Sequence, residues 1–172
     1  MTPADRTRAW VEHFVVRLGL CPFAALPLHR GTVAFVSCDR SETEAVFYWT
    51  LEQIRSFVDQ SPEQVTTTLL IFPEALSDFS EFLDLVEELE EVLSTSGADS
   101  LVQFAHFHPD YCFADLSPED PANKTNRSPH PVLQLLRVDG VAEAVAAYPQ
   151  VEAIPERNIS LLRRLAAAGE LP

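Results

Sequence analysis

Apolar and polar positions alternate along this chain with two different periods, so the sequence predicts helices and strands in turn. Apolar residues at helical spacing first appear after Thr2 and end at Gly19, and short runs of β-branched and apolar residues follow. Long helical segments separate these runs, which indicates crossover connections in a layered α/β sheet. The predicted strands span 32–38, 67–72 and 101–107, and the predicted helices span 2–19, 42–60, 77–96, 129–137, 139–147 and 155–169.

Local signals support the predicted helix ends. Thr2 before Pro3 is typical of a helix start, and the run Ser41-Glu42-Thr43-Glu44 has the spacing of a capping box. Ser128-Pro129 resembles another cap followed by a first helical residue, which predicts a helix to about Arg137. Asp139 is predicted to cap the short helix that follows, and Pro155 to begin the last one.

The fold expected from this order is one globular α/β domain over residues 1–172. Its small sheet would have three or four strands, mainly parallel or mixed, with five to six helices. The fourth strand could come from Tyr111–Ala114. With 47% hydrophobic residues, the 172-residue chain can bury a substantial core.

Composition excludes some classes of function. A net charge of -14 makes nucleic acid an improbable general ligand, because its phosphates require clustered cations. No apolar run is long enough for a transmembrane helix, and the N-terminus lacks a secretory pattern. The three cysteines have no disulfide-framework spacing, so we expect a cytoplasmic protein without membrane association.

Charge is unevenly distributed. No Lys or Arg occurs between Arg55 and Lys124, and six of the twelve basic residues follow from Lys124 onward. This basic part could hold a small anion, or its arginines could pair with the acidic helices. The predicted helix 77–96 has an acidic face, which is either solvated or a surface for a protein partner. That face contains Asp78, Glu81, Glu87, Glu88 and Glu91.

A long polar segment follows the predicted strand 101–107. Irregular segments of this length in compact domains are usually functional or disordered, and the aromatic residues here argue against disorder. We interpret it as an anion pocket, in which Arg127 lies near a predicted helix start. The alternative is a structural Ω-type loop braced by Asn, Arg and Tyr. The candidate substrate-binding residues are Tyr111, Asn123, Asn126, Arg127 and Arg137.

His106, His108 and Asp110 form an H-x-H-x-D pattern at the end of that strand. Alternate residues of a strand share a face, so the three could bind one metal ion, although Pro109 interrupts the strand. His106 could instead be a hydrogen-bonded core residue. His108 is the candidate general acid or base.

Cys21 is the candidate nucleophile or redox centre, provided that the fold brings it close to His108. The alternative is a small buried hydrophobic residue, since a helix C-terminus favours the protonated thiol. Cys21-Pro22 also occurs where thiolates bind haem, so haem or metal binding through Cys21, His106 and His108 stays open.

Several motifs in a fixed order carry a family resemblance that spans nearly the whole chain. The chain resembles the bacterial and plastid family filed as domain of unknown function 1415, for which the resemblance implies no established activity. That family usually has a histidine at the position of Gln134, and Cys112 is peculiar to this chain. The motifs are Leu20-Cys21-Pro22-Phe23-Ala24, Phe107-His108-Pro109-Asp110-Tyr111 with Phe113, Thr125-Asn126-Arg127-Ser128-Pro129, Leu135-Leu136-Arg137 and Ile154-Pro155-Glu156-Arg157-Asn158.

Two hypotheses about function follow. The first is a small thiol- or His-dependent hydrolase or transferase whose anionic substrate is held by Arg127 and Arg137. The second is a non-enzymatic binding or interaction protein, which could use metal or haem, or recruit a partner through the acidic helix 77–96. No particular cofactor is predicted.

Overall fold

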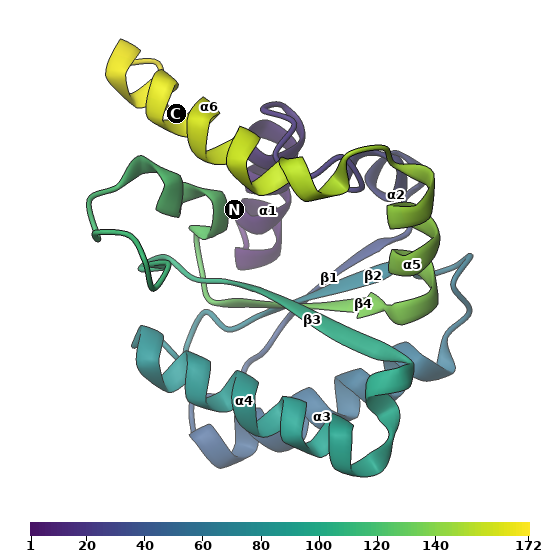
Figure 1. The fold of residues 1–172 in the computed structure, drawn as a ribbon. Helices are drawn as coiled ribbons and strands as arrows, with labels where there is room; N and C mark the ends of the chain where they lie inside the picture. The colour runs from purple at the N-terminus through teal and green to yellow at the C-terminus, as the bar shows by residue number, and fades with distance from the viewer.

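A mixed four-stranded sheet with the strand order β1-β2-β4-β3 forms the centre of the protein, in a computed structural model that describes residues 1–172 (Figure 1). β1 and β2 are parallel, and β4 pairs antiparallel with both β2 and β3. The predicted α/β fold with a small mixed sheet is therefore confirmed. The strands are β1 (Val33–Ser37), β2 (Thr67–Ile71), β3 (Val102–Phe107) and β4 (Val132–Arg137).

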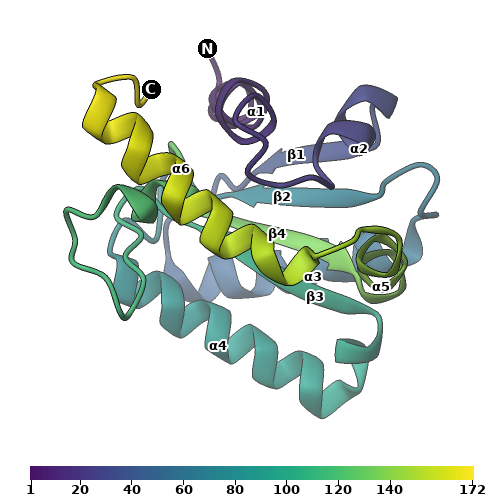
Figure 2. The ribbon, with the colours of Figure 1, turned by 45° about the horizontal axis from the view of Figure 1, so that its top comes forward.

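Helices cover both faces of this sheet. α3 and α4 lie together on one face, whereas α1 and α6 lie on the other (Figures 1 and 2). The helices are α1 (Pro3–Trp10), which continues into a π-helix (Val11–Val16), α2 (Ala25–Arg30), α3 (Thr43–Asp59), α4 (Phe79–Ser96), α5 (Val138–Ala147) and α6 (Ile154–Ala168), with 3₁₀ turns at Ala98–Ser100, Pro121–Asn126 and Val151–Ala153. None of these helices has the length and apolar character needed to cross a membrane.

The sheet separates two cores, because successive strand residues point to opposite faces. In β2, Leu70 joins the large core under α3 and α4, while its neighbours Leu69 and Ile71 join the core under α1. Farther from the sheet, Phe14, Leu20 and Leu162 pack α6 against the first helical segment, which comprises α1 and the π-helix that continues it. Burial of this apolar surface is the main force that holds the layers together.

The predicted helix 129–137 is wrong. Residues Val132–Arg137 form β4, a central strand with partners on both sides. Leu133 and Leu135 point into the core under α3 and α4, and Val132 points to the opposite core, so the segment follows a strand period. Pairing on both edges satisfies its backbone groups and overrides the helix propensity of leucine.

Other local expectations have mixed outcomes. Thr2 caps α1 through a complete capping box with Asp5, as the Thr-Pro start predicts. The capping box expected at Ser41-Glu42-Thr43-Glu44 does not form, since Glu42 occupies the cap position without a side-chain hydrogen bond. Asp139 lies in the first turn of α5 and is not its cap. Tyr111–Ala114 is irregular, so the fourth strand comes from β4 instead.

The carboxyl ends of β1, β2 and β3 lie at one edge of the sheet, because all three strands run in the same direction. The irregular segment 108–131 follows β3 at this edge and contains the 3₁₀ turn Pro121–Asn126. Ligands in open α/β sheets commonly bind at such an edge. The segment therefore lies where this fold most often binds a ligand.

Candidate functional site

The two ends of segment 108–131 are tied together beside β3. The backbone N–H of His108 donates to the carbonyl of Asn126 at 3.0 Å. The side-chain amide of Asn126 donates to the carbonyl of His106 at 3.2 Å. This closure matches an Ω-type loop, whose ends meet and whose interior is filled by its own side chains. Asn126 therefore holds the two ends of the loop against β3.

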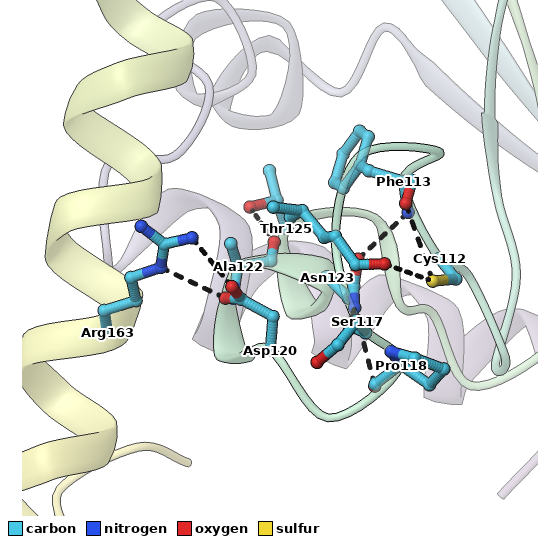
Figure 3. A network of polar contacts seen from close by, with 10 residues as sticks. Cys112, Phe113, Ser117, Pro118, Asp120, Ala122, Asn123, Thr125 and Arg163 are labelled. Carbon is cyan, nitrogen blue, oxygen red and sulfur yellow. Dashed lines mark hydrogen bonds and ion pairs between the residues drawn. The ribbon is translucent and has the colours of Figure 1, made fainter.

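Asn123 is the buried centre of this loop (Figure 3). Its Oδ1 accepts from the backbone N–H of Phe113 at 3.0 Å, and its Nδ2 donates to the carbonyl of Ser117 at 2.8 Å. A buried amide must find such partners because desolvating it without them is costly. The hydrogen-bonding capacity of Asn123 is thus directed at the loop backbone.

An ion pair attaches the same loop to α6. Arg163 of α6 donates to both carboxylate oxygens of Asp120, with Nη2 at 2.7 Å and Nε at 3.2 Å (Figure 3). Asp120 also caps the following 3₁₀ turn by accepting from the backbone N–H of Ala122. The Arg163 guanidinium is the main cause that holds the pKa of Asp120 below its usual value.

Arg127 bonds to the loop as well. Its Nε donates to the carbonyl of Tyr111 at 2.9 Å, and its Nη2 donates to the carbonyl of Pro118 at 2.7 Å. Ser128, which was expected to cap a helix, donates its hydroxyl to the carbonyl of His130 instead. Arg127 therefore joins two parts of the loop, at Tyr111 and at Pro118, and does not lie at a helix start.

Arg137 lies at the other end of β4 and closes the C-terminal end of α3. Its Nη2 donates to the carbonyls of Phe57, Gln60 and Val65 at 2.9–3.0 Å. Burial lowers the pKa of Arg137 below its ordinary value. The two arginines predicted to hold one anion thus lie at opposite ends of β4, and each donates to backbone carbonyls.

The predicted metal set His106, His108 and Asp110 does not form a metal-binding cluster. His108 is fully buried, with Nδ1 accepting from the backbone N–H of Asp110 at 3.0 Å and Nε2 within 3.0 Å of the Leu76 carbonyl. These partners place the proton on Nε2 and leave neither nitrogen for a metal or a substrate. Leu76 has a left-handed backbone, with φ 60°, which the bond from His108 helps to hold.

Aromatic rings surround the two histidines on the α4 side of the sheet. His108 packs against Phe79 and Phe82, and His106 stacks on Tyr111 with ring centres 5.6 Å apart. Nδ1 of His106 is buried without a hydrogen-bond partner. Burial lowers the pKa of His106, against an opposing effect of the Glu90 carboxylate. Tyr111 thus packs within this aromatic group.

Cys21 lies on the opposite side of the sheet from His108, in the turn between the first helical segment and α2. Burial raises the pKa of the Cys21 thiol, and the nearby N–H groups of Phe23 and Ala24 only partly oppose this. The neighbouring backbone is held by α6, where Asn158 donates to the carbonyl of Leu20 at 2.7 Å. The fold therefore does not join Cys21 and His108 in one constellation, nor Cys21 and the two histidines in one haem or metal site.

Two surface grooves were not apparent from the sequence. One of about 460 Å³ lies between α3 and α4, and the other, of about 360 Å³, lies between α6 and the end of the first helical segment. Two features of the sequence point to these grooves. Val92 falls outside the buried stripe of α4, and Arg157 and Arg164 lie on one face of α6. Phe47 is half-buried, since it packs against the large core and also lines the first groove.

Comparison with known proteins gives a family and no activity. The family described as "Protein of unknown function (DUF1415)" matches residues 2–170, so the chain belongs to it. No curated protein and no solved structure shows a significant match. The resemblance drawn from the motifs is therefore confirmed. Two of the family motifs meet in the structure. Arg157 and Asn158 of one motif donate hydrogen bonds to the carbonyls of Gly19 and Leu20, just before Cys21 of the other.

Proposed function

We propose that this member of the DUF1415 family is a non-enzymatic interaction protein, which binds a basic and partly apolar segment of another protein in the groove between α3 and α4. The observation that carries the proposal is an apolar groove bordered by carboxylates that have no intramolecular partner. The enzyme hypothesis has less support, because Arg127, Arg137 and His108 already bond to the protein's own backbone.

The groove has an apolar interior. Phe47 of α3 and Val92 of α4 supply its hydrophobic lining, with Thr95 and Ser96 at one end. Tyr48, with 58% of its surface exposed, packs its ring 5.5 Å from that of Phe47. Exposed aromatic and aliphatic side chains that lie together in a concave surface are typical of a partner-binding site.

The charge around the groove defines the occupant. Glu88 and Glu91 line it, and α4 contains no Lys or Arg. The two ion pairs of the protein, Asp39 with Arg40 and Asp120 with Arg163, do not involve α4. The arginines therefore do not neutralise this acidic helix. A segment with Lys or Arg beside apolar residues would complement both the charge and the lining.

The mode of binding follows from the geometry of two neighbouring helices. A groove between helices accepts an amphipathic segment that inserts apolar side chains at helical spacing. Flanking basic residues would meet Glu88 and Glu91, and they would also accelerate association at low ionic strength. We therefore expect the affinity to fall as the salt concentration rises. The affinity that remains at high salt would come from the apolar contacts.

Isothermal titration calorimetry with a synthetic peptide of Lys and Leu at helical spacing tests this function. We expect saturable binding that the double variant E88K/E91K weakens at least tenfold. The matched control E143K/E170K changes the net charge equally at exposed positions outside the groove, and it should bind almost as the parent does. Val92→Ser should also weaken binding, since it shortens the apolar lining without changing charge.

Two outcomes would contradict the proposal. The first is an absence of saturable binding at millimolar peptide. The second is an equal loss of affinity in E88K/E91K and in the control, which would mean that the peptide responds only to net charge.

A further inference from the structure

A second groove lies between α6 and the end of the first helical segment. Both elements lie on the face of the sheet opposite to α3 and α4 (Figure 2). Its volume is about 360 Å³. Positions three and four apart on a helix share a face, so α6 presents one continuous stripe of side chains to this groove. The groove is lined by Leu18, Gly19, Arg157, Ser160, Leu161 and Arg164.

Arg157 is held in place at one end of this groove. Its Nη2 donates to the carbonyl of Gly19 at 2.6 Å, and its Nη1 lies 3.5 Å from the hydroxyl of Tyr148. Gly19 adopts a left-handed backbone with φ 65°, which turns the chain at this point. A guanidinium that is already fixed loses little conformational entropy when its remaining N–H groups bind a ligand.

Arg164 makes no bond within the protein, in contrast to several other arginines. Arg127 and Arg137 donate to backbone carbonyls, and Arg163 pairs with Asp120, whereas no hydrogen bond or ion pair within the protein engages Arg164. No carboxylate lines the groove, although the chain has 26 acidic residues. The groove is therefore a locally cationic hollow on an acidic protein.

From this arrangement we infer that the groove binds a small organic anion, with a phosphate or carboxylate group on the two guanidiniums and a short apolar body on Leu18 and Leu161. The hydroxyl of Ser160, between the two arginines along α6, can donate a further hydrogen bond. The net charge of -14 opposes large polyanions, which restricts the ligand to a small one. This inference does not depend on the proposed α3–α4 interaction.

Nuclear magnetic resonance titration with phenyl phosphate and with inorganic phosphate tests the site. Phenyl phosphate should shift the signals of Gly19, Ser160 and Leu161 in a saturable manner, and it should bind more tightly than inorganic phosphate because of its apolar ring. Arg164→Gln should weaken phenyl phosphate binding about tenfold, because a charge-assisted hydrogen bond is lost. The matched control Arg55→Gln removes an exposed charge from α3, on the other face of the sheet, and should leave the affinity unchanged.

The site would be refuted by shifts that lie elsewhere, by the absence of saturation at millimolar phenyl phosphate, or by equal weakening in Arg164→Gln and Arg55→Gln. The last result would assign the binding to overall charge. Arg164 makes no internal bond, so its variant should retain the parent's unfolding temperature, and that measurement confirms that any lost affinity comes from the groove.

Discussion

The guanidinium of Arg137 lies 4.2 Å from the centre of the Phe57 ring and donates to the backbone carbonyl of the same residue at 3.0 Å. Arg137 of β4 thereby supplies a hydrogen-bond donor to the last turn of α3. The remaining carbonyls it reaches, those of Gln60 and Val65, belong to the connection from α3 to β2. One side chain thus joins β4 to α3 and to the connection between α3 and β2.

Replacing Arg137 by Ala should lower the free energy of unfolding by about 2 kcal/mol, because carbonyls at a helix end lose a charged donor and Phe57 loses its stacking partner. Urea denaturation measures this change. Arg55→Ala, which removes an exposed arginine of α3, is the control and should have little effect. An unchanged stability in Arg137→Ala would show that water replaces the arginine without cost, and it would return Arg137 to the list of candidate ligand-binding residues.

His108→Ala should also destabilise the protein, by about 3 kcal/mol. The substitution leaves a cavity among Phe79 and Phe82 and removes the partner of the strained Leu76 backbone. Thermal and urea unfolding check the loss, with the exposed His29→Ala as control. If His108→Ala kept the parent's stability, the structural role given to this histidine would be wrong.

Cys21 should alkylate more slowly than an unperturbed cysteine at pH 7–8. Burial raises the pKa of its thiol above the ordinary value, so little thiolate is present in that range. The rate can be measured with iodoacetamide by mass spectrometry of the peptide that contains Cys21. Rapid alkylation with a depressed pKa would instead favour the thiol-dependent enzyme.

Stability should decline in mild acid through His106. Its pKa is lowered in the folded protein by burial, so below pH 6.5 the unfolded chain binds more protons than the native state. The contribution of neutral His106 to the free energy of unfolding is therefore complete above about pH 6.5, and it decreases as the pH falls toward the lowered native pKa. His106→Gln should remove this part of the pH dependence in urea denaturation between pH 7 and pH 5.

Burial also lowers the pKa of His130, so some pH dependence should remain in the His106→Gln variant. A pH profile identical to that of the parent would contradict the assignment to His106. A still steeper decline would contradict it as well, since the variant has one titrating group fewer.

The sequence predicted most of the fold because local signals and tertiary pairing agree along much of it. Three strands and the long helices followed the hydrophobic period, and the Thr2 cap formed as expected. β4 was missed because Leu133, Leu135 and Leu136 suit a helix as well as a strand, and only pairing with β2 and β3 decides between them. Its partners are distant in sequence and leave no local signal.

The candidate site was predicted less well than the fold. An irregular segment after the predicted strand 101–107 is found, but it extends to residue 131 because the predicted helix 129–137 does not form. Asn123 and Arg127 bond its backbone, the latter at the carbonyl of Tyr111, as in the Ω-loop alternative. The chemistry of an arginine does not reveal whether its partner is a ligand or a carbonyl, so Arg127 and Arg137 could not be assigned from sequence. Grooves form between elements, and a pattern along one element cannot show them.

The central claim is that the α3–α4 groove, and not segment 108–131, is the binding surface. Residue-resolved nuclear magnetic resonance of the parent protein, titrated with the Lys/Leu peptide, tests it most directly. We expect saturable shifts at Phe47, Glu91, Val92 and Thr95, with the signals of Asn123 and Arg127 unmoved. Shifts concentrated in segment 108–131, or an absence of shifts in the groove at millimolar peptide, would contradict the account.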